Sequence, residues 1–257
     1  MVSRGHGPDV IVVGTCGFGG SRARAFRDLE AVEIQETFDR RLDRDRARAW
    51  RDESPGDFTF TVKASHFITH DASSLTLRRA VRRIPDEERA AYGGFQATRA
   101  VREGWEATLA AAEALRAKAI VFETPATFGP TEANRDALYR FFESIATPAT
   151  KVIELQGPWA SHLVERVCED LGLVHAVDPF AKEPATYGTA YFRLHGIPPG
   201  LSRSGSSYSA SDFGKLHTVC NEYDDAYVMF GNPTMHDDAA RFGRFLARDA
   251  VGSSGAK

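Results

Sequence analysis

The sequence predicts an α/β fold, a (β/α)8 TIM barrel formed by a single domain over residues 1–257. Eight short segments rich in β-branched and aromatic residues alternate with helical patterns along the whole chain. A length of 257 residues suits one large barrel domain. The rival fold is an open, doubly wound sheet. No GxGxxG turn follows the first segment, because GTCGFGG has its glycines at another spacing.

The predicted strands are short, and a polar or glycine-bearing stretch closes each of them. They cover residues 10–15, 31–35, 58–63, 119–124, 151–156, 173–178, 190–195 and 226–231. Because strands that alternate with helices pair in parallel, we expect the eight to close into one barrel.

Start and stop signals place helices between these strands. Thr131 is expected to cap the helix after the fourth strand. The helical stretch WASHLVERVCEDLGL is expected to end at Gly172. Thr234, with Asp237 three residues later, resembles a capping box and predicts the start of the last helix.

The connection between the third and fourth strands, residues 71–105, does not follow the regular pattern. The pair Gly93-Gly94 divides it, so we expect an irregular, enlarged loop that flanks the barrel mouth. Flexible segments are also predicted at 197–209 and at the chain ends, 1–8 and 251–257.

Composition is that of a soluble globular protein, with 42% hydrophobic and 26% charged residues. No apolar run approaches the roughly 20 residues that span a bilayer, so no membrane partner is expected. The N-terminal residues lack an apolar signal-peptide core, which predicts a cytoplasmic location.

The net charge of −3 provides no general attraction to nucleic acid. Arginines are nevertheless crowded into the first third of the chain. In DRRLDRDRARAWR (39–51) they alternate with aspartates, which predicts a solvated helix face with ion pairs. LRRAVRR (77–83) has fewer acids and is the better candidate for a phosphate-facing patch, although a solvated face is favoured there too.

The three cysteines show no CxxC spacing, which disfavours a disulfide framework and a cysteine-rich zinc site. Cys168 and Cys220 lie on apolar helical faces and are expected to be inert. Cys16 falls in a loop at the site, where a packed residue is favoured over a reactive thiol.

Active sites of (β/α)8 barrels lie at the carboxyl ends of the strands, so the residues there carry the functional prediction. In FTFTVK, alternation places Thr59, Thr61 and Lys63 on one face and the phenylalanines on the other. Phenylalanines belong against the helices, so Lys63 is expected to face the barrel mouth.

The same alternation directs further polar side chains toward this end, and together they predict a site. They are Glu33, Gln35, Glu123, Glu154, Gln156, Arg193 and His195, with Asp178 ending the sixth strand and Asn232 following the eighth. The structural alternative is an ion-pair network in which Lys63 and Arg193 neutralise Glu33 and Glu154. Function is favoured, because buried ion pairs add little net stability.

Three histidines in or near the predicted strands are weaker candidates for the site. His66 and His70 come after the third strand, where a site role and a capping role are equally favoured. His175 lies within the sixth strand and is expected to be packed and hydrogen-bonded.

Several motifs together resemble one family. They are GTCGF (14–18), VEIQETFD (32–39), FTFTVKASHFITH (58–70), VFETPATF (121–128), VHAVDPF (174–180), YFRLHG (191–196) and YVMFGNPTMHDDAARF (227–242). In this order they are similar to the domain of unknown function 72 family, the YecE-like proteins, and most of all to archaeal members. The resemblance implies a TIM barrel loosely related to the xylose isomerase and endonuclease IV group, with no established reaction.

The resemblance also implies which polar positions matter. They are Glu33, Lys63, His70, Glu154, Asp178, Arg193, His195 and Asn232. The chain departs from the family pattern at Glu123, where glutamine is usual, at Gln156, where arginine is usual, and at Gly231, where asparagine is usual. These departures make the site more negative and weaken the anion contact that the family pattern implies.

Three hypotheses of function follow. The first is metal-assisted hydrolysis of a phosphoester, including one in nucleic acid, with oxygen and imidazole ligands suited to magnesium, manganese or zinc. The metal ligands would be Glu33, Glu123 and Asp178, with Glu154 and His195 as further donors, while Lys63 and Arg193 would hold the anion. Fold-level analogy favours this hypothesis.

The second is metal-free isomerase or lyase chemistry on a small anionic metabolite. Lys63, desolvated beside Arg193, would have a lowered pKa and act as a base or Schiff-base nucleophile, with Glu154 or Glu33 as acid–base partner. The third is a non-enzymatic module that binds nucleic acid or protein.

We assign roles on this basis. Catalytic roles go to Lys63, Glu154 and His195, and substrate binding to Arg193, Asn232, His70 and Gln156. A divalent metal ion is the cofactor that the first hypothesis requires, and the second requires none. The favoured ligand is a small anionic or phosphorylated molecule, with nucleic acid as the alternative.

Overall fold

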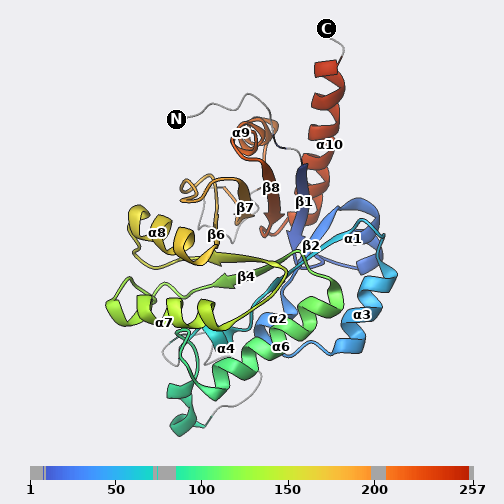
Figure 1. The fold of residues 1–257 in the computed structure, drawn as a ribbon. Coiled ribbons are helices and arrows are strands. Elements are labelled where there is room, and N and C mark those ends of the chain that lie inside the picture. The colour runs from blue at the N-terminus through green and yellow to red at the C-terminus, as the bar shows by residue number, and fades with distance from the viewer. Residues whose placement is uncertain (1–7, 9, 72–73, 75–84, 198–206, 255–257) are drawn as a thin grey trace. The chain divides into compact units, whose positions relative to one another are not determined.

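The structure is a computed structural model that describes residues 8, 10–71, 74, 85–197 and 207–254. Strands and helices alternate along the chain (Figure 1). The eight strands form a closed barrel in chain order, and each pairing that the structure defines is parallel. The predicted barrel fold is confirmed.

All eight predicted strands are present, and their ends differ from the prediction by no more than two residues. The strands are β1 (Val10–Cys16), β2 (Ala31–Ile34), β3 (Thr59–Lys63), β4 (Ala119–Glu123), β5 (Thr150–Glu154), β6 (Val174–Val177), β7 (Thr189–Leu194) and β8 (Asp225–Phe230). The described helices are α1 (Arg22–Asp28), α2 (Glu36–Asp39), α3 (Arg44–Glu53), α4 (His66–Thr69), the 3-10 helix η1 (Asp86–Ala91), α6 (Arg99–Leu115), α7 (Glu132–Ser144), α8 (Ser161–Leu171), α9 (Ala210–Cys220) and α10 (Met235–Ser254).

The chain divides into two compact units. Unit 1 comprises residues 1–33, 57–59 and 176–257, and unit 2 comprises residues 34–56 and 60–175. The single domain over 1–257 therefore stays a prediction.

The core of unit 1 lies where helices cover the outer face of its strands. Phe213 of α9 and Phe242 of α10 have ring centroids 5.4 Å apart, and Phe242 also packs against Phe230 of β8. Gly14 allows β1 to approach β2, because a Cβ atom there would overlap the carbonyl oxygen of Ala31.

The core of unit 2 is an aromatic cluster between β4 and its helices. Phe122 lies 5.0 Å from Phe142 of α7 and 6.1 Å from Trp105 of α6, measured between ring centroids. Because side chains alternate along a strand, the neighbours Val121 and Glu123 point to the opposite face.

Two of the predicted helix ends are confirmed. The Thr131 hydroxyl accepts a hydrogen bond from the backbone N–H of Asn134 at 3.2 Å, and Gly172 ends α8 in the left-handed conformation at φ 61°. For the last helix, the predicted partner of Thr234 was wrong. Thr234 precedes α10, but its hydroxyl donates to Asp238 at 2.7 Å, while Asp237 accepts from Arg24.

The irregular connection after β3 is present, but its bounds differ from the prediction. The 3-10 helix η1 and a turn at Gly93-Gly94 lie within it, whereas α6 begins at Arg99, so residues 99–105 are helical. Helix α10 reaches Ser254, so residues 251–254 are helical too rather than a flexible tail. The basic stretch 77–83, most of the predicted loop 197–209, and the end segments 1–7 and 255–257 lie outside the described residues.

The arginine-rich stretch 39–51 is ion-paired, as predicted. The arginines of α3 that form these pairs are Arg44 with Glu113 at 3.5 Å, Arg46 with Glu36 at 3.3 Å, and Arg48 with Asp45 at 3.2 Å. Among the helices that the structure describes, none combines the length and apolar character that crossing a bilayer requires.

Candidate functional site

Lys63, the last residue of β3, is a buried cation in unit 2. Only 7% of the residue is exposed. Its Nζ atom lies 2.9 Å from Oε2 of Glu123 and 3.8 Å from the ring centroid of Phe38. A carboxylate and an aromatic face are both partners that an ammonium group attracts. Glu123 was not among the carboxylates that the predicted ion-pair network gave to Lys63 and Arg193.

Local structure around Lys63 explains why Phe38 lies over its ammonium group. Thr37, at the start of α2, donates its hydroxyl hydrogen bond to the carbonyl oxygen of Lys63 at 2.6 Å. The same hydroxyl lies 3.2 Å from the carbonyl oxygen of Ile34 at the end of β2. This threonine therefore ties α2 to the end of β3 and places the next residue, Phe38, beside Lys63.

Glu154 lies on the strand next to Glu123. The two are paired in register at the ends of β5 and β4, so their side chains point to the same face. Glu154 is 7% exposed. Gln156, two residues further along the chain, is instead exposed. Its position gives no support to the predicted substrate-binding role.

His70 follows α4 and borders the same group of residues. It is 5% exposed, its Nδ1 lies 2.7 Å from the Thr69 hydroxyl, and its ring centroid is 5.1 Å from that of Phe38. Burial lowers the pKa of His70 to about 4, so the imidazole is neutral at pH 7. His66 is also buried, with Nδ1 bonded to the carbonyl oxygen of Phe38, and burial lowers its pKa as well.

The low pKa of His70 predicts a loss of stability in mild acid. Below its ordinary pKa of 6.5 the unfolded chain binds a proton that the folded chain excludes until about pH 4. The free energy of unfolding should therefore fall as the pH drops from 6.5 to about 4, by at most about 1.4 kcal/mol per pH unit for this residue. Urea unfolding of His70→Gln between pH 7 and 5 should show a shallower fall than the parent protein. If the free energy of unfolding fell equally with pH in the two proteins, the low pKa assigned to His70 would be contradicted.

Unit 1 contains a second buried ion pair. Glu33 is fully buried and Arg193 is 2% exposed. A guanidinium nitrogen of Arg193 donates to Oε1 of Glu33 at 2.9 Å, and the Tyr191 hydroxyl donates to Oε2 at 2.9 Å. The ring of Tyr191 stacks on Tyr227 with 5.6 Å between centroids. Arg193 and Glu33 therefore form an ion pair of the kind that the structural alternative described, while the substrate-binding role of Arg193 stays a prediction.

Asp178 and Asn232 organise loops in unit 1. Asp178 accepts hydrogen bonds from the backbone N–H groups of Phe180 at 3.0 Å and His195 at 3.1 Å. The Asn232 side-chain amide donates to Asp238 at 2.8 Å, and Asp238 is a buried carboxylate. His195 itself is partly exposed.

The predicted metal ligands do not fit a resident divalent ion. Glu33 receives hydrogen bonds from a guanidinium and a phenol, Glu123 pairs with an ammonium, and Asp178 receives backbone N–H groups. Over the residues that the structure describes, no group of three or more His, Cys, Asp or Glu side chains is placed to hold a metal. These carboxylates are instead committed to cations and to N–H or O–H donors.

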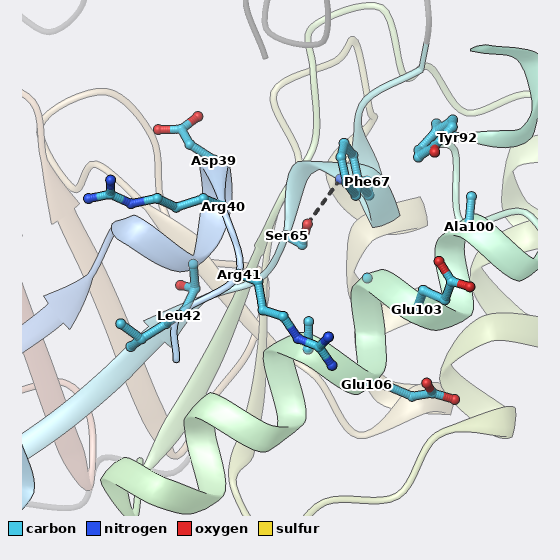
Figure 2. Close-up of a pocket in the computed structure, with 13 residues that line it drawn as sticks. Asp39, Arg40, Arg41, Leu42, Ser65, Phe67, Tyr92, Ala100, Glu103 and Glu106 are labelled. Carbon is cyan, nitrogen blue, oxygen red and sulfur yellow. Dashed lines mark hydrogen bonds between the residues drawn. The ribbon is translucent and has the colours of Figure 1, made fainter. Parts of the chain in front are cut away.

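A pocket of about 690 Å³ that the sequence did not predict lies in unit 2 beside α2, α4 and α6 (Figure 2). Phe67 and Tyr92 line one part of it, and Arg41 extends from the loop after α2 toward α6. Two of the charged residues that line it are ion-paired, Arg40 with Glu36 at 2.9 Å and Glu103 with Arg99 at 2.7 Å. None of the predicted site residues lines it. Gly104 lets α6 approach α4 beside this pocket, because a Cβ atom there would lie 3.2 Å from Cβ of Phe67.

Comparisons with known proteins agree with the barrel. Residues 23–255 match the sequence model of a family described as "Protein of unknown function DUF72". A solved structure of a DUF72 family protein from Enterococcus faecalis is similar, with a TM-score of 0.68 and 17% identity over 95% of this chain and 99% of that one. Comparison with curated protein sequences gave no match.

Two further solved structures share the fold. A xylose isomerase domain containing protein from Salmonella typhimurium has a TM-score of 0.57 and 15% identity, over 93% of this chain and 96% of that one. Endonuclease IV from Thermus thermophilus has a TM-score of 0.50 and 13% identity, over 94% and 100%. At these identities the similarity shows the fold alone.

Proposed function

Since the chain belongs to the DUF72 family, whose description gives no reaction, we propose a function from the geometry in unit 2. The protein is an enzyme that transfers a proton at the carbon next to a carbonyl group, in a small hydroxy-carbonyl metabolite and without a metal ion. The observation that carries the proposal is the buried ammonium group of Lys63, held 2.9 Å from Glu123 at the end of β3.

Each side chain has one role in this reaction. Glu154 takes the proton from the carbon, and the electron pair of that C–H bond moves to the carbonyl oxygen to give an enediolate. Lys63 donates a hydrogen bond to that oxygen and stabilises its developing charge. Glu123 is a positioning residue that holds Lys63.

The contacts of Lys63 favour this role over Schiff-base chemistry. A Schiff base forms on a neutral amine. The carboxylate of Glu123 and the ring of Phe38 are placed as partners of an ammonium group. Lys63 is therefore proposed as a hydrogen-bond donor rather than a nucleophile.

Charge in this cluster argues for a neutral substrate. One ammonium, Lys63, is placed among two carboxylates, Glu123 and Glu154, while His70 is neutral. A phosphorylated or carboxylated compound would meet an excess of negative charge. We therefore replace the small anion expected from the sequence by a neutral hydroxyaldehyde or hydroxyketone.

The other two hypotheses find less support. Metal-assisted phosphoester hydrolysis needs a ligand set, and the predicted carboxylates have other partners. Similarity of fold to endonuclease IV, at 13% identity, does not supply that set. A nucleic-acid binding module needs basic residues that are available to phosphates, and three of the four arginines of α3 are ion-paired.

Deuterium exchange tests the proposal. The EDTA-treated protein is incubated in D2O with neutral aldoses and ketoses of three to six carbons and with their phosphates, and loss of the α-proton signal is followed by NMR. We expect exchange with at least one neutral compound and a rate lower by about 100-fold or more in Glu154→Gln. Glu132→Gln, an exposed carboxylate of α7, is the matched control and should exchange at the parent rate.

Two outcomes would overturn the proposal. The first is exchange that appears only after magnesium, manganese or zinc is restored, which would favour the metal-assisted reaction. The second is the absence of exchange with every compound. If salt-sensitive binding of single-stranded DNA accompanied that absence, a binding module would be favoured instead.

A further inference from the structure

Three adjacent strands of unit 1 bring Cys16, Gly231 and His195 side by side. Strands β7, β8 and β1 are neighbours, with β8 in the middle. Met229 of β8 pairs in register with Arg193 on one side and Gly14 on the other. Two residues further along each chain, and therefore on the same face, come His195, Gly231 and Cys16.

Gly231 leaves a space between the other two side chains. A Cβ atom at this position would lie 3.5 Å from Sγ of Cys16 and 3.6 Å from Nδ1 of His195. The thiol and the imidazole therefore border the same space, which any side chain at residue 231 would enter. We call the group Cys16, Gly231 and His195 the Gly231 notch.

Contacts in unit 1 fix both walls of the notch. The backbone N–H of His195 donates to Asp178 at 3.1 Å, which anchors the residue just beyond the end of β7. Cys16 is the last residue of β1, and its Sγ lies 3.9 Å from the carbonyl oxygen of Met229. The pair is thus held by strand ends, which are the rigid elements on which barrel sites are built.

We propose that Cys16 is a nucleophilic thiol, that His195 accepts its proton, and that the Gly231 notch receives the carbonyl group of a small aldehyde. The S–H bond breaks and its proton passes to the imidazole. Sulfur then bonds to the carbonyl carbon as the C=O π pair moves to oxygen, and the imidazolium returns the proton to that oxygen. The product is a thiohemiacetal, formed without any further reactant.

The other two cysteines provide an internal contrast. Cys168 and Cys220 are buried, and burial raises the pKa of each thiol to about 12. Cys16 is partly exposed. The sequence favoured a packed, unreactive Cys16, because sequence alone does not place His195 and a missing side chain next to it.

Alkylation of the intact protein tests the thiol. The protein is treated with iodoacetamide at pH 7, and the rate at each cysteine is measured by peptide mass spectrometry. We expect Cys16 to react more than about tenfold faster than Cys168 and Cys220, and its rate in His195→Ala to fall by about tenfold. A Cys16 rate unchanged in His195→Ala, or no faster than the rates of the buried thiols, would overturn the proposal.

A side chain at residue 231 would fill the notch and tests most directly whether this space gives access to Cys16. Gly231→Ala should fold normally, because its Cβ contacts are at van der Waals distance and residue 231 is not in the left-handed region. It should slow alkylation of Cys16 by about tenfold or more, since the new methyl group lies against the sulfur. Gly243→Ala is the control, because a Cβ atom there meets nothing within 4 Å. Equal Cys16 rates in the two variants would contradict the notch.

Protection by glycolaldehyde tests the ligand class. Glycolaldehyde should slow alkylation of Cys16 in the parent protein, and ethylene glycol, which lacks the carbonyl group, should not. A reactive Cys16 that glycolaldehyde fails to protect would overturn the carbonyl assignment. This inference is independent of the reaction proposed for Lys63, because its readout is chemical labelling rather than exchange.

Discussion

Replacing Arg193 by methionine is expected to lower the free energy of unfolding by about 3–5 kcal/mol, because it leaves a buried carboxylate without its cation. Glu33 is fully buried and receives one hydrogen bond from Arg193 and one from Tyr191. Loss of the guanidinium group leaves this carboxylate with a large desolvation penalty. Urea unfolding at pH 7 measures the change.

Two further variants separate this penalty from a general effect of losing an arginine. The double variant that carries Glu33→Gln together with Arg193→Met lacks the unpaired charge, so it should regain part of the lost stability. Arg48→Met, which removes an exposed ion pair with Asp45, should change the free energy of unfolding by less than about 1 kcal/mol. If Arg193→Met cost no more than Arg48→Met, the buried pair would not be the stabilising element described.

Gly93→Ala is expected to be the second severe variant, with a cost of about 2–5 kcal/mol. Gly93 has φ 75°, and a Cβ atom on it would overlap the carbonyl carbon and oxygen of His70. Its backbone N–H also donates to the carbonyl oxygen of Phe67 at 2.8 Å. This turn therefore holds the end of α4, so the variant should also disturb His70.

The adjacent residue provides the matched control. Gly94 has a similar φ of 59°, but a Cβ atom there meets nothing closer than 3.9 Å. Gly94→Ala should therefore cost only the backbone strain, about 1 kcal/mol. Equal destabilisation by the two alanines, measured by thermal unfolding, would mean that the contact with His70 contributes nothing.

Alternation along strands explains how much of the fold could be predicted. A period of two residues fixes which side chains face the helices, and Phe60 of β3 lies against Arg51 of α3, as predicted. The same rule agrees with the burial of Lys63, Glu33 and Arg193. Their functional roles stay predictions.

Contacts made by individual side chains could not be predicted in the same way. The contact of Lys63 with Glu123 was not predicted, because the reach of a flexible side chain across neighbouring strands is not fixed by its own strand. Phe38 comes from a helix, and strand periodicity says nothing about it. The pocket in unit 2 depends on how closely α6 approaches α4 at Gly104.

Helix ends were easier to predict from the sequence than the individual side-chain contacts near them. Thr131 and Gly172 act through residues three or four positions away in the chain, so sequence spacing sufficed. Thr234 has two nearby aspartates, and only the structure shows that Asp238 is the one it contacts. Cys16 and His195 are brought together by β8, which lies between their strands.

The proposed function depends on the ammonium group of Lys63, which would stabilise negative charge on a substrate oxygen. The exchange rate of Lys63→Met in D2O, measured with the EDTA-treated protein on the neutral sugar that the parent exchanges, tests it most directly. We expect a rate lower by about 100-fold or more, in a variant whose circular dichroism spectrum matches that of the parent. A folded Lys63→Met that exchanges the sugar at the parent rate would contradict it.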